Sequence, residues 1–277
     1  MRYAICNETF LDWPFDKAFA FARACGYTGI EIAPFTMGDA GQMFNVRDVS
    51  AERRREVRQL AQQEGLDVVG LHWLLAKTEN LYLTSPEVAV RRATSDYLCE
   101  LARLCGELGG SVMVLGSPLQ RNLLPGVTHE QAMEYAADVL TAALPTCEAC
   151  STTIALEPLG PSEGDFLLTA ADAIRLIDRI DSPLCRLHLD CKAMSTESQP
   201  IDTIIRQCQE YMVHFHANDA NRLGPGMGEI DFGPIFEALN EVDYQGWVSV
   251  EVFDYTPGVE RLARESLQYM QRVVASL

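Results

Sequence analysis

Positive charge is scarce in this sequence, and its scarcity argues against several classes of partner. The 277 residues include 22 Lys and Arg against 39 Asp and Glu, a formal net charge of −17. A field of that sign repels phosphate backbones and anionic lipid, so we expect no nucleic-acid partner and no membrane partner. A small anionic substrate is still compatible with it, because a bound metal inverts the sign of the charge locally.

Long apolar runs are absent as well. No stretch reaches the roughly 20 apolar residues that a membrane helix needs, and the N-terminal MRYAICNETF lacks the apolar core of a signal peptide. The nine cysteines are odd in number and mostly lie within apolar patterns, which favours reduced, buried thiols and a cytoplasmic protein. Cys147 and Cys150 form a CxxC pair with no second pair, so a zinc or redox role is not favoured.

Short β-branched runs alternate with longer amphipathic segments along the chain. The predicted strands are Tyr3–Cys6, Gly29–Ala33, Asp67–His72, Ser111–Leu115, Thr152–Glu157, Cys185–Asp190, Met212–His216 and Trp247–Glu251. The predicted helices are Phe15–Cys25, Ala51–Glu64, Pro86–Leu108, Glu130–Cys150, Thr169–Ile180, Ile201–Glu210, Gly233–Val242 and Val259–Val274. This alternation predicts a single (β/α)8 TIM barrel over residues 1–277, with its active site at the C-terminal ends of the strands.

A doubly wound open sheet is the alternative α/β fold. It usually has fewer strands, and it needs a glycine-rich phosphate turn after the first strand. Here the first strand is followed by Asn7-Glu8-Thr9-Phe10, which contains no glycine. No low-complexity linker or block of charge marks a domain boundary, so the barrel is favoured.

Four successive predicted strands end in a side chain that can bind a metal. The runs TIALE, RLHLD, VHFH and VSVE end in Glu157, Asp190, His216 and Glu251. A carboxylate or imidazole at the end of a buried strand is costly to desolvate unless it is paired or binds a cation. Any one of them alone could simply cap the next helix. Together at one barrel mouth they predict a divalent metal site, with Mn²⁺ favoured and Mg²⁺, Co²⁺ or Zn²⁺ as alternatives.

Two further histidines, His188 and His214, lie two residues before Asp190 and His216. Residues two apart in a strand share a face, so these imidazoles lie one layer deeper in the barrel. We expect buried, hydrogen-bonded groups that support the ligands rather than ligands themselves.

Other polar residues near strand ends are candidate substrate contacts. Glu8 follows the first strand, and His72 ends the third strand, where it either touches substrate or caps the strand. Lys192 follows Asp190 by two residues and is either a substrate cation or a solvated side chain. Three aromatic residues just past strand ends either line a sugar pocket or belong to the core: Trp13, Trp73 and Phe253.

The motifs at these positions carry a family resemblance. The matching pieces are LEPLG at Leu156–Gly160, LD at Leu189–Asp190, HFHAND at His214–Asp219, Arg222, PGMGEIDF at Pro225–Phe232 and VEVF at Val250–Phe253. The chain resembles the xylose isomerase-like TIM-barrel superfamily of sugar isomerases and epimerases. The nearest chemistry is that of the ketose 3-epimerases that act on D-tagatose and D-psicose.

The resemblance implies roles for individual residues. The four strand-end residues would be the metal ligands, and Glu163 and Arg222 would bind the substrate. The epimerases carry a substrate-binding histidine three residues after the aspartate ligand, where this chain has Ala193 beside Lys192. This departure favours a modified, oxidised or acidic sugar over a free ketohexose. Relatives are often dimers or tetramers, so the resemblance also raises the prospect of a homo-oligomer.

The reaction we expect is proton transfer next to a carbonyl. A metal-stabilised enediolate would form between Glu157 and Glu251, which act as an opposed acid and base and thereby epimerise or isomerise a sugar. Three alternatives stay open. One is a lyase or dehydratase on a keto-sugar or inositol derivative, and another is a non-catalytic sugar-binding barrel. The third is an endonuclease IV-like enzyme, which the five histidines and the acidic charge disfavour.

Overall fold

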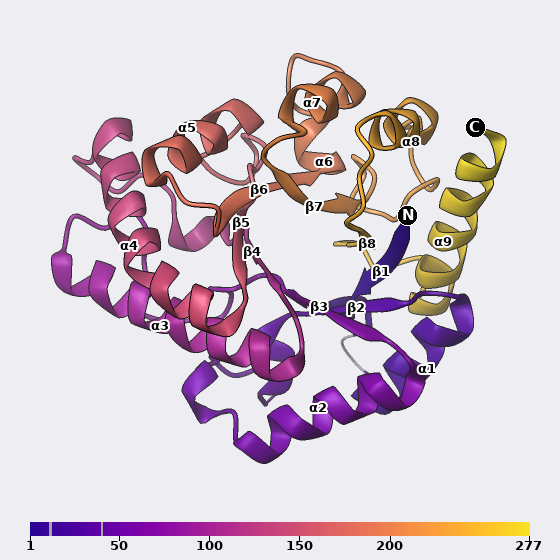
Figure 1. Ribbon diagram of the computed structural model, residues 1–277, viewed down its shortest axis with the longest axis horizontal. Coiled ribbons are helices and arrows are strands. Elements are labelled where there is room, and N and C mark those ends of the chain that lie inside the picture. Colours follow the sequence, from indigo (N-terminus) through magenta and orange to yellow (C-terminus); the bar gives the residue numbers. More distant parts are fainter. Residues whose placement is uncertain (11–12, 40) are drawn as a thin grey trace.

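Eight parallel strands close into a barrel in the computed structural model, which describes residues 1–10, 13–39 and 41–277 (Figure 1). Each strand pairs with the next along the chain, and β8 pairs with β1. The strands are β1 (Arg2–Cys6), β2 (Gly29–Ile32), β3 (Asp67–Leu71), β4 (Val112–Leu115), β5 (Thr153–Leu156), β6 (Cys185–Asp190), β7 (Met212–Ala217) and β8 (Trp247–Val250). The predicted TIM barrel is confirmed.

Helices surround the barrel (Figure 1). The longer ones are α1 (Phe15–Cys25), α2 (Ala51–Glu64), α3 (Val88–Leu108), α4 (His129–Cys150), α5 (Ala170–Ile180), α7 (Ile201–Cys208), α8 (Phe232–Glu241) and α9 (Val259–Ser276). The short ones are α6 (Cys191–Met194) and the 3₁₀ turns η1 (Asn7–Phe10), η2 (Pro34–Met37), η3 (Val46–Asp48) and η4 (Pro118–Gln120). No helix in the described ranges is long and apolar enough to cross a membrane.

Several element ends differ from the sequence-based expectation by one or two residues, and one short helix was not expected. Pro86 does not open α3, because the helix starts at Val88 and Glu87 is its N-cap. The short helix α6, which follows Asp190 directly, was not predicted. Its formation matters for the site, because it places the backbone of Ala193 against the Asp190 carboxylate.

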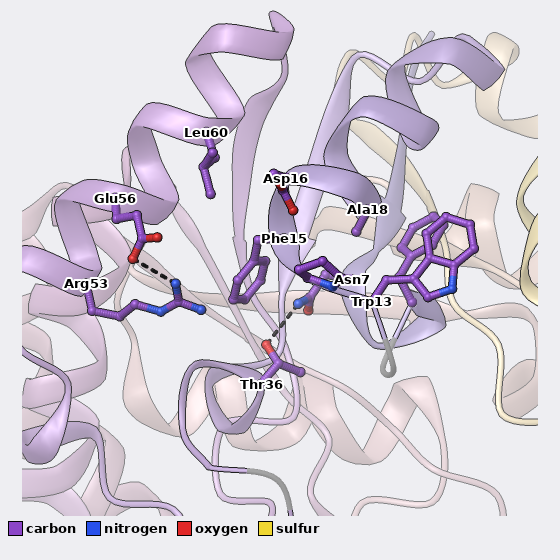
Figure 2. Close-up of a pocket in the computed structure, with 11 residues that line it drawn as sticks. Asn7, Trp13, Phe15, Asp16, Ala18, Thr36, Arg53, Glu56 and Leu60 are labelled. Carbon is purple, nitrogen blue, oxygen red and sulfur yellow. Dashed lines mark hydrogen bonds and ion pairs between the residues drawn. The ribbon is translucent and has the colours of Figure 1, made fainter.

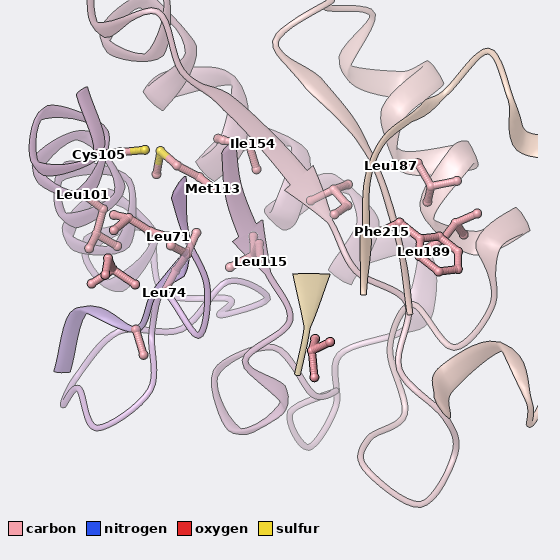
Figure 3. Close-up of a cluster of buried hydrophobic side chains, with 14 of the residues drawn as sticks. Leu71, Leu74, Leu101, Cys105, Met113, Leu115, Ile154, Leu187, Leu189 and Phe215 are labelled. Atoms are coloured by element: carbon pink, nitrogen blue, oxygen red, sulfur yellow. The ribbon is translucent and has the colours of Figure 1, made fainter. Parts of the chain in front are cut away.

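The hydrophobic core lies between the strands and the helices that surround them (Figure 3). Leu187 and Leu189 of β6 are fully buried in it, as is Leu101 of α3. His188 and Asp190 alternate with these leucines along β6, so they face the other side of the strand, toward the barrel interior. The alternation therefore packs one face of β6 against the helices and leaves polar side chains inside the barrel.

The register of β6 and β7 sets the layers of the interior. Asp190 pairs with His216, and His188 pairs with His214. Because residues two apart share a face, Asp190 and His216 form an upper layer and the two other histidines a lower layer. His188 therefore lies one layer below Asp190, and His214 one layer below His216.

Candidate active site

The barrel brings the four strand-end residues together at its C-terminal mouth. Glu157, Asp190, His216 and Glu251 are all buried, with exposed fractions of 5% or less. One ligand atom each from Glu157, Asp190 and His216, together with one from His188, lie within 4.8 Å of one another. The Oε2 atom of Glu251 lies 3.1 Å from Nδ1 of His216. The arrangement is a compact cluster of groups that can bind a metal.

The His216 ring is held between two carboxylates. Its Nδ1 faces Glu251, and its Nε2 lies 3.1 Å from Oε1 of Glu31. Burial acts to lower the pKa of His216, but the charges of Glu31 and Glu251 outweigh it and raise that pKa well above its usual value. Glu31 on Nε2 fixes the orientation of the ring, as is common at metal centres, and directs Nδ1 to the side where Glu251 lies.

Both histidines of the lower layer were expected to be buried and hydrogen-bonded, and only one of them is. Nε2 of His214 lies 2.8 Å from Oε2 of Glu31, so His214 is a buried, hydrogen-bonded support. His188 was expected to be hydrogen-bonded too, and that expectation is wrong. Neither of its ring nitrogens has a hydrogen-bond partner among the described residues. The difference arises because β2 supplies Glu31 beside His214, whereas Nε2 of His188 is still 3.9 Å from the carboxylate of Glu157.

Both oxygens of Asp190 accept hydrogen bonds. The Ala193 backbone N–H donates to Oδ1 (2.8 Å), which makes Asp190 the N-cap of α6. The Asn218 side-chain amide donates to Oδ2 (2.6 Å). The helix-cap alternative therefore applies to Asp190, and it does not compete with a ligand role. Each oxygen keeps a second lone pair, and the two hydrogen bonds hold the carboxylate in place.

Glu157 is the least constrained of the carboxylates. In the described part of the chain its side-chain oxygens accept no hydrogen bond at standard geometry. Burial, followed by the charges of Glu251 and Asp190, raises its pKa well above the usual value. Gly116, just past β4, makes room for it, since a Cβ at Gly116 would lie only 1.8 Å from Oε2 of Glu157.

Glu251 is held on both oxygens. The Trp73 indole N–H donates to Oε1 (2.7 Å), and His216 lies against Oε2. Burial acts to raise the pKa of Glu251, but the charge and hydrogen bond of His216 outweigh it and lower that pKa. The environments of Glu157 and Glu251 thus move the two pKa values in opposite directions, which is the pattern expected of an acid and a base.

A cavity of about 340 Å³ lies over this cluster, and Glu157 and Glu251 both line it. Trp73 and Phe253, which also line the cavity, stack with ring centroids 6.0 Å apart and an interplanar angle of 13°. These two aromatics are where a sugar-pocket wall was expected. Trp13 does not belong to this wall, because it lines a separate cavity beside α1 and α2 (Figure 2).

Three candidate substrate contacts lie at or near this cavity. Glu163 and Arg222 line it. Nζ of Lys192 lies 2.5 Å from Oε2 of Glu163 and 4.7 Å from the centre of the Phe253 ring, so Lys192 sits behind the lining and is paired rather than solvated. The Arg222 backbone has φ 73°, and its carbonyl accepts hydrogen bonds from the N–H groups of Phe253 and Asp254. These bonds tie the Arg222 loop to the end of β8.

Glu8 and His72 contact each other. Both are fully buried, and Nε2 of His72 is 2.6 Å from Oε2 of Glu8. Neither lines the cavity, although both belong to a group whose ligand atoms lie within 4.8 Å of Glu251. Glu8 lies in the 3₁₀ turn η1, and direct contact of Glu8 or His72 with a substrate stays a prediction.

The family model described as "Xylose isomerase-like TIM barrel" matches residues 19–273. The chain belongs to this family. A D-psicose 3-epimerase of Enterocloster bolteae is 30% identical over 91% of this chain and 82% of its own length. A probable ketose 3-epimerase of Synechocystis sp. is 25% identical over 93% of this chain and 90% of its own length. Because these relatives are epimerases, the prediction of an isomerase is confirmed.

A solved structure carries the same fold. The apo form of the 3-keto-D-glucoside 4-epimerase from E. coli superimposes with a TM-score of 0.84 at 21% identity, and the match covers 98% of this chain and 99% of that protein. At that identity the likeness establishes only the fold. The family placement therefore rests on the family model and on the relatives described above.

Sequence reasoning missed one buried arginine beside the site of this family member. Arg121 is 2% exposed. Its guanidinium donates to the backbone carbonyls of Glu157 (2.6 Å), Leu115 (3.2 Å) and Leu167 (3.3 Å). Burial lowers its pKa to about 10, even though the charges of Glu157 and Glu163 act to raise it. A lone arginine in a loop has no sequence signal that separates it from a solvated one.

Proposed function

We propose that this protein is a metal-dependent sugar epimerase that inverts a carbon next to a carbonyl group. The observation that carries the proposal is the pair Glu157 and Glu251, which directly follow β5 and β8 and line one cavity. Their pKa values are moved in opposite directions by their surroundings. A cavity with an acid and a base on different sides is what inversion at a carbon requires.

The donor set fits a divalent cation. Three buried carboxylates in one mouth repel one another, and burial raises the pKa values of both Glu157 and Asp190. A cation held by Glu157, Asp190, His216 and Glu251 would offset that repulsion. Carboxylate oxygens with one imidazole suit Mn²⁺, with Mg²⁺, Co²⁺ and Zn²⁺ as alternatives. When bound, the ion supplies a Lewis acid that stabilises negative charge on the oxygens of an enediolate.

The two glutamates move the proton. Glu251 is the carboxylate with the lowered pKa, and its oxygens are held by Trp73 and His216. It removes the proton from the carbon next to the carbonyl. Glu157, which takes a proton from water through the cavity that it lines, delivers it to the opposite face of that carbon and so inverts the centre. In the reverse reaction the two residues exchange roles.

The remaining cavity residues position the sugar. Arg222 and Glu163 bind its hydroxyl oxygens, and Trp73 with Phe253 packs against its apolar face. The ion pair between Lys192 and Glu163 adds a cation beside this polar wall. With a D-psicose 3-epimerase among its relatives, and Ala193 where the epimerases carry a substrate histidine, the substrate class we propose is a ketose or an oxidised, 3-keto sugar.

The test is isotope exchange. The protein with added Mn²⁺ is incubated in deuterated water with a panel of ketoses and 3-keto glycosides, and the products are analysed by NMR. We expect inversion with deuterium at the inverted carbon, and its loss in Glu157→Gln and Glu251→Gln. An aldose product would identify an isomerase instead, and loss of water would identify a lyase. If no carbonyl sugar exchanges, the proton-transfer proposal is wrong.

A further inference from the structure

His188 is a buried imidazole that lies beside Glu157 in the lower layer of the barrel. It is fully buried in β6, and neither Nδ1 nor Nε2 has a hydrogen-bond partner among the described residues. A buried polar group without a partner costs about 1–3 kcal/mol, so such groups are rare and call for an explanation. Its neighbour in the same layer, His214, is hydrogen-bonded to Glu31.

The unpartnered ring lies directly against the proposed metal site. Nε2 of His188 is 3.9 Å from Oε1 of Glu157, and its ring centre is 4.1 Å from that of His216. One donor atom each from His188, Glu157, Asp190 and His216 lie within 4.8 Å of one another. A cation about 2.0–2.2 Å from each nitrogen or oxygen donor leaves opposite donors roughly 4 Å apart. Donor atoms within 4.8 Å of one another are therefore close to that spacing.

We propose that His188 is a further metal ligand of this protein, so that the ion is bound by two imidazoles together with the carboxylates. The inference rests on the proposed metal site and adds to it. A second nitrogen donor raises the affinity for Co²⁺, Ni²⁺ and Zn²⁺ relative to Mn²⁺ and Mg²⁺, because imidazole suits the former ions and carboxylate oxygen the latter. The site would therefore select Co²⁺ or Zn²⁺ more strongly than three carboxylates and one imidazole would.

The first experiment counts imidazoles in the wild-type protein. Metal is removed with a chelator, one equivalent of Cu²⁺ is added as a probe, and pulsed EPR measures the coupled imidazole nitrogens. We expect two coordinated imidazoles, from His188 and His216. A single imidazole would overturn the inference. This measurement needs no variant, so it holds even if substitution at this buried position prevents folding.

The second experiment compares metal affinities by competition with a chromophoric chelator. His188→Gln should lower the affinity for Co²⁺ by at least about 10-fold and the affinity for Mn²⁺ by less. The matched control is His129→Gln, because His129 starts α4 and belongs to none of the metal-ligand groups in the described chain. Equal Co²⁺ affinities in the wild type and His188→Gln contradict the inference.

A further variant separates this inference from the proposed function. Asp190→Asn should abolish tight metal binding if the proposed site is correct. If Asp190→Asn abolishes binding while His188→Gln changes nothing, the function stands and the role of His188 is refuted. If Asp190→Asn binds Co²⁺ and Mn²⁺ as the wild type does, the metal site itself is wrong and the inference falls with it.

Discussion

Replacing Gly116 by alanine should disable the site while sparing the fold. The added Cβ would lie 1.8 Å from Oε2 of Glu157 and 2.9 Å from its Cδ. Ordinary van der Waals contact begins at 3.4 Å, so the oxygen has to move by about 1.6 Å. The backbone of Gly116 is not in the left-handed region, so alanine meets no conformational barrier there. The whole effect of the substitution should therefore fall on the Glu157 carboxylate.

The expected losses follow from that displacement. A misplacement of about 1 Å in a catalytic site can cost about 100-fold in rate, so kcat should fall at least that far. Overpacking costs about 1–3 kcal/mol, and the open side of the cavity keeps the loss in unfolding free energy near the lower end. Gly116→Ala should also bind Mn²⁺ about 10–100-fold more weakly, because a proposed ligand is shifted.

Kinetics, metal titration and urea denaturation on one preparation measure the three effects. The matched control is Gly233→Ala in the first turn of α8, where a Cβ would meet only the Asp231 side chain, at 3.2 Å. The control should keep wild-type kcat and Mn²⁺ affinity. If Gly116→Ala also stays within twofold of the wild type in both, then Glu157 is not confined as we describe and its assigned role is wrong.

Three further outcomes follow from the same contacts. Arg121→Met leaves the buried carbonyl of Glu157 without a donor and removes a second donor from the carbonyls of Leu115 and Leu167, so it should lower the unfolding free energy by about 2 kcal/mol in urea. The exposed Arg261→Met should change it by less than about 1 kcal/mol. Trp73→Phe keeps the aromatic wall but loses the hydrogen bond to Glu251, so kcat should fall about 10-fold with little change in KM. An unchanged kcat would show that the indole does not position Glu251. The folded-state pKa of Glu157 is raised, so its stabilising contribution is present at pH below about 4.3, the usual glutamate value, and is lost as pH rises through the folded pKa. Metal-free Glu157→Gln should therefore exceed the wild type in Tm at pH 8 and lose that advantage near pH 4; equal values of Tm at both would refute the pKa assignment.

The fold was predictable because local signals mark most element ends. The bounds of α1 and α2 agree with the prediction residue for residue, and each helix ends at a glycine, Gly26 or Gly65, whose φ of 108° or 66° few other residues adopt. At α3 the proline rule failed. Pro86 precedes the helix instead of opening it, and Glu87 is the N-cap without a side-chain cap bond.

Much of the candidate site was predictable for a related reason. A polar residue that closes an apolar run is a local signal, and a parallel barrel brings all such ends to one face. The pairing of Glu8 with His72 joins residues 64 positions apart, so no local pattern indicates it. Trp73 reaches Glu251 from a backbone with φ 53°, a conformation uncommon outside glycine. Contacts of this kind depend on the closed barrel and become visible only in three dimensions.

The two deep histidines show how the barrel differentiates equivalent positions. His188 and His214 pair across β6 and β7, and each lies two residues before a proposed ligand. The register therefore gives them equivalent positions, and only the side chains that other strands place beside them distinguish them. Beside His214, β2 supplies Glu31, which also holds the His216 ring. Beside His188, β5 supplies Glu157, which comes no closer than 3.9 Å and faces the cavity. One imidazole thus has a protein partner on its Nε2, and we infer that the other binds the ion.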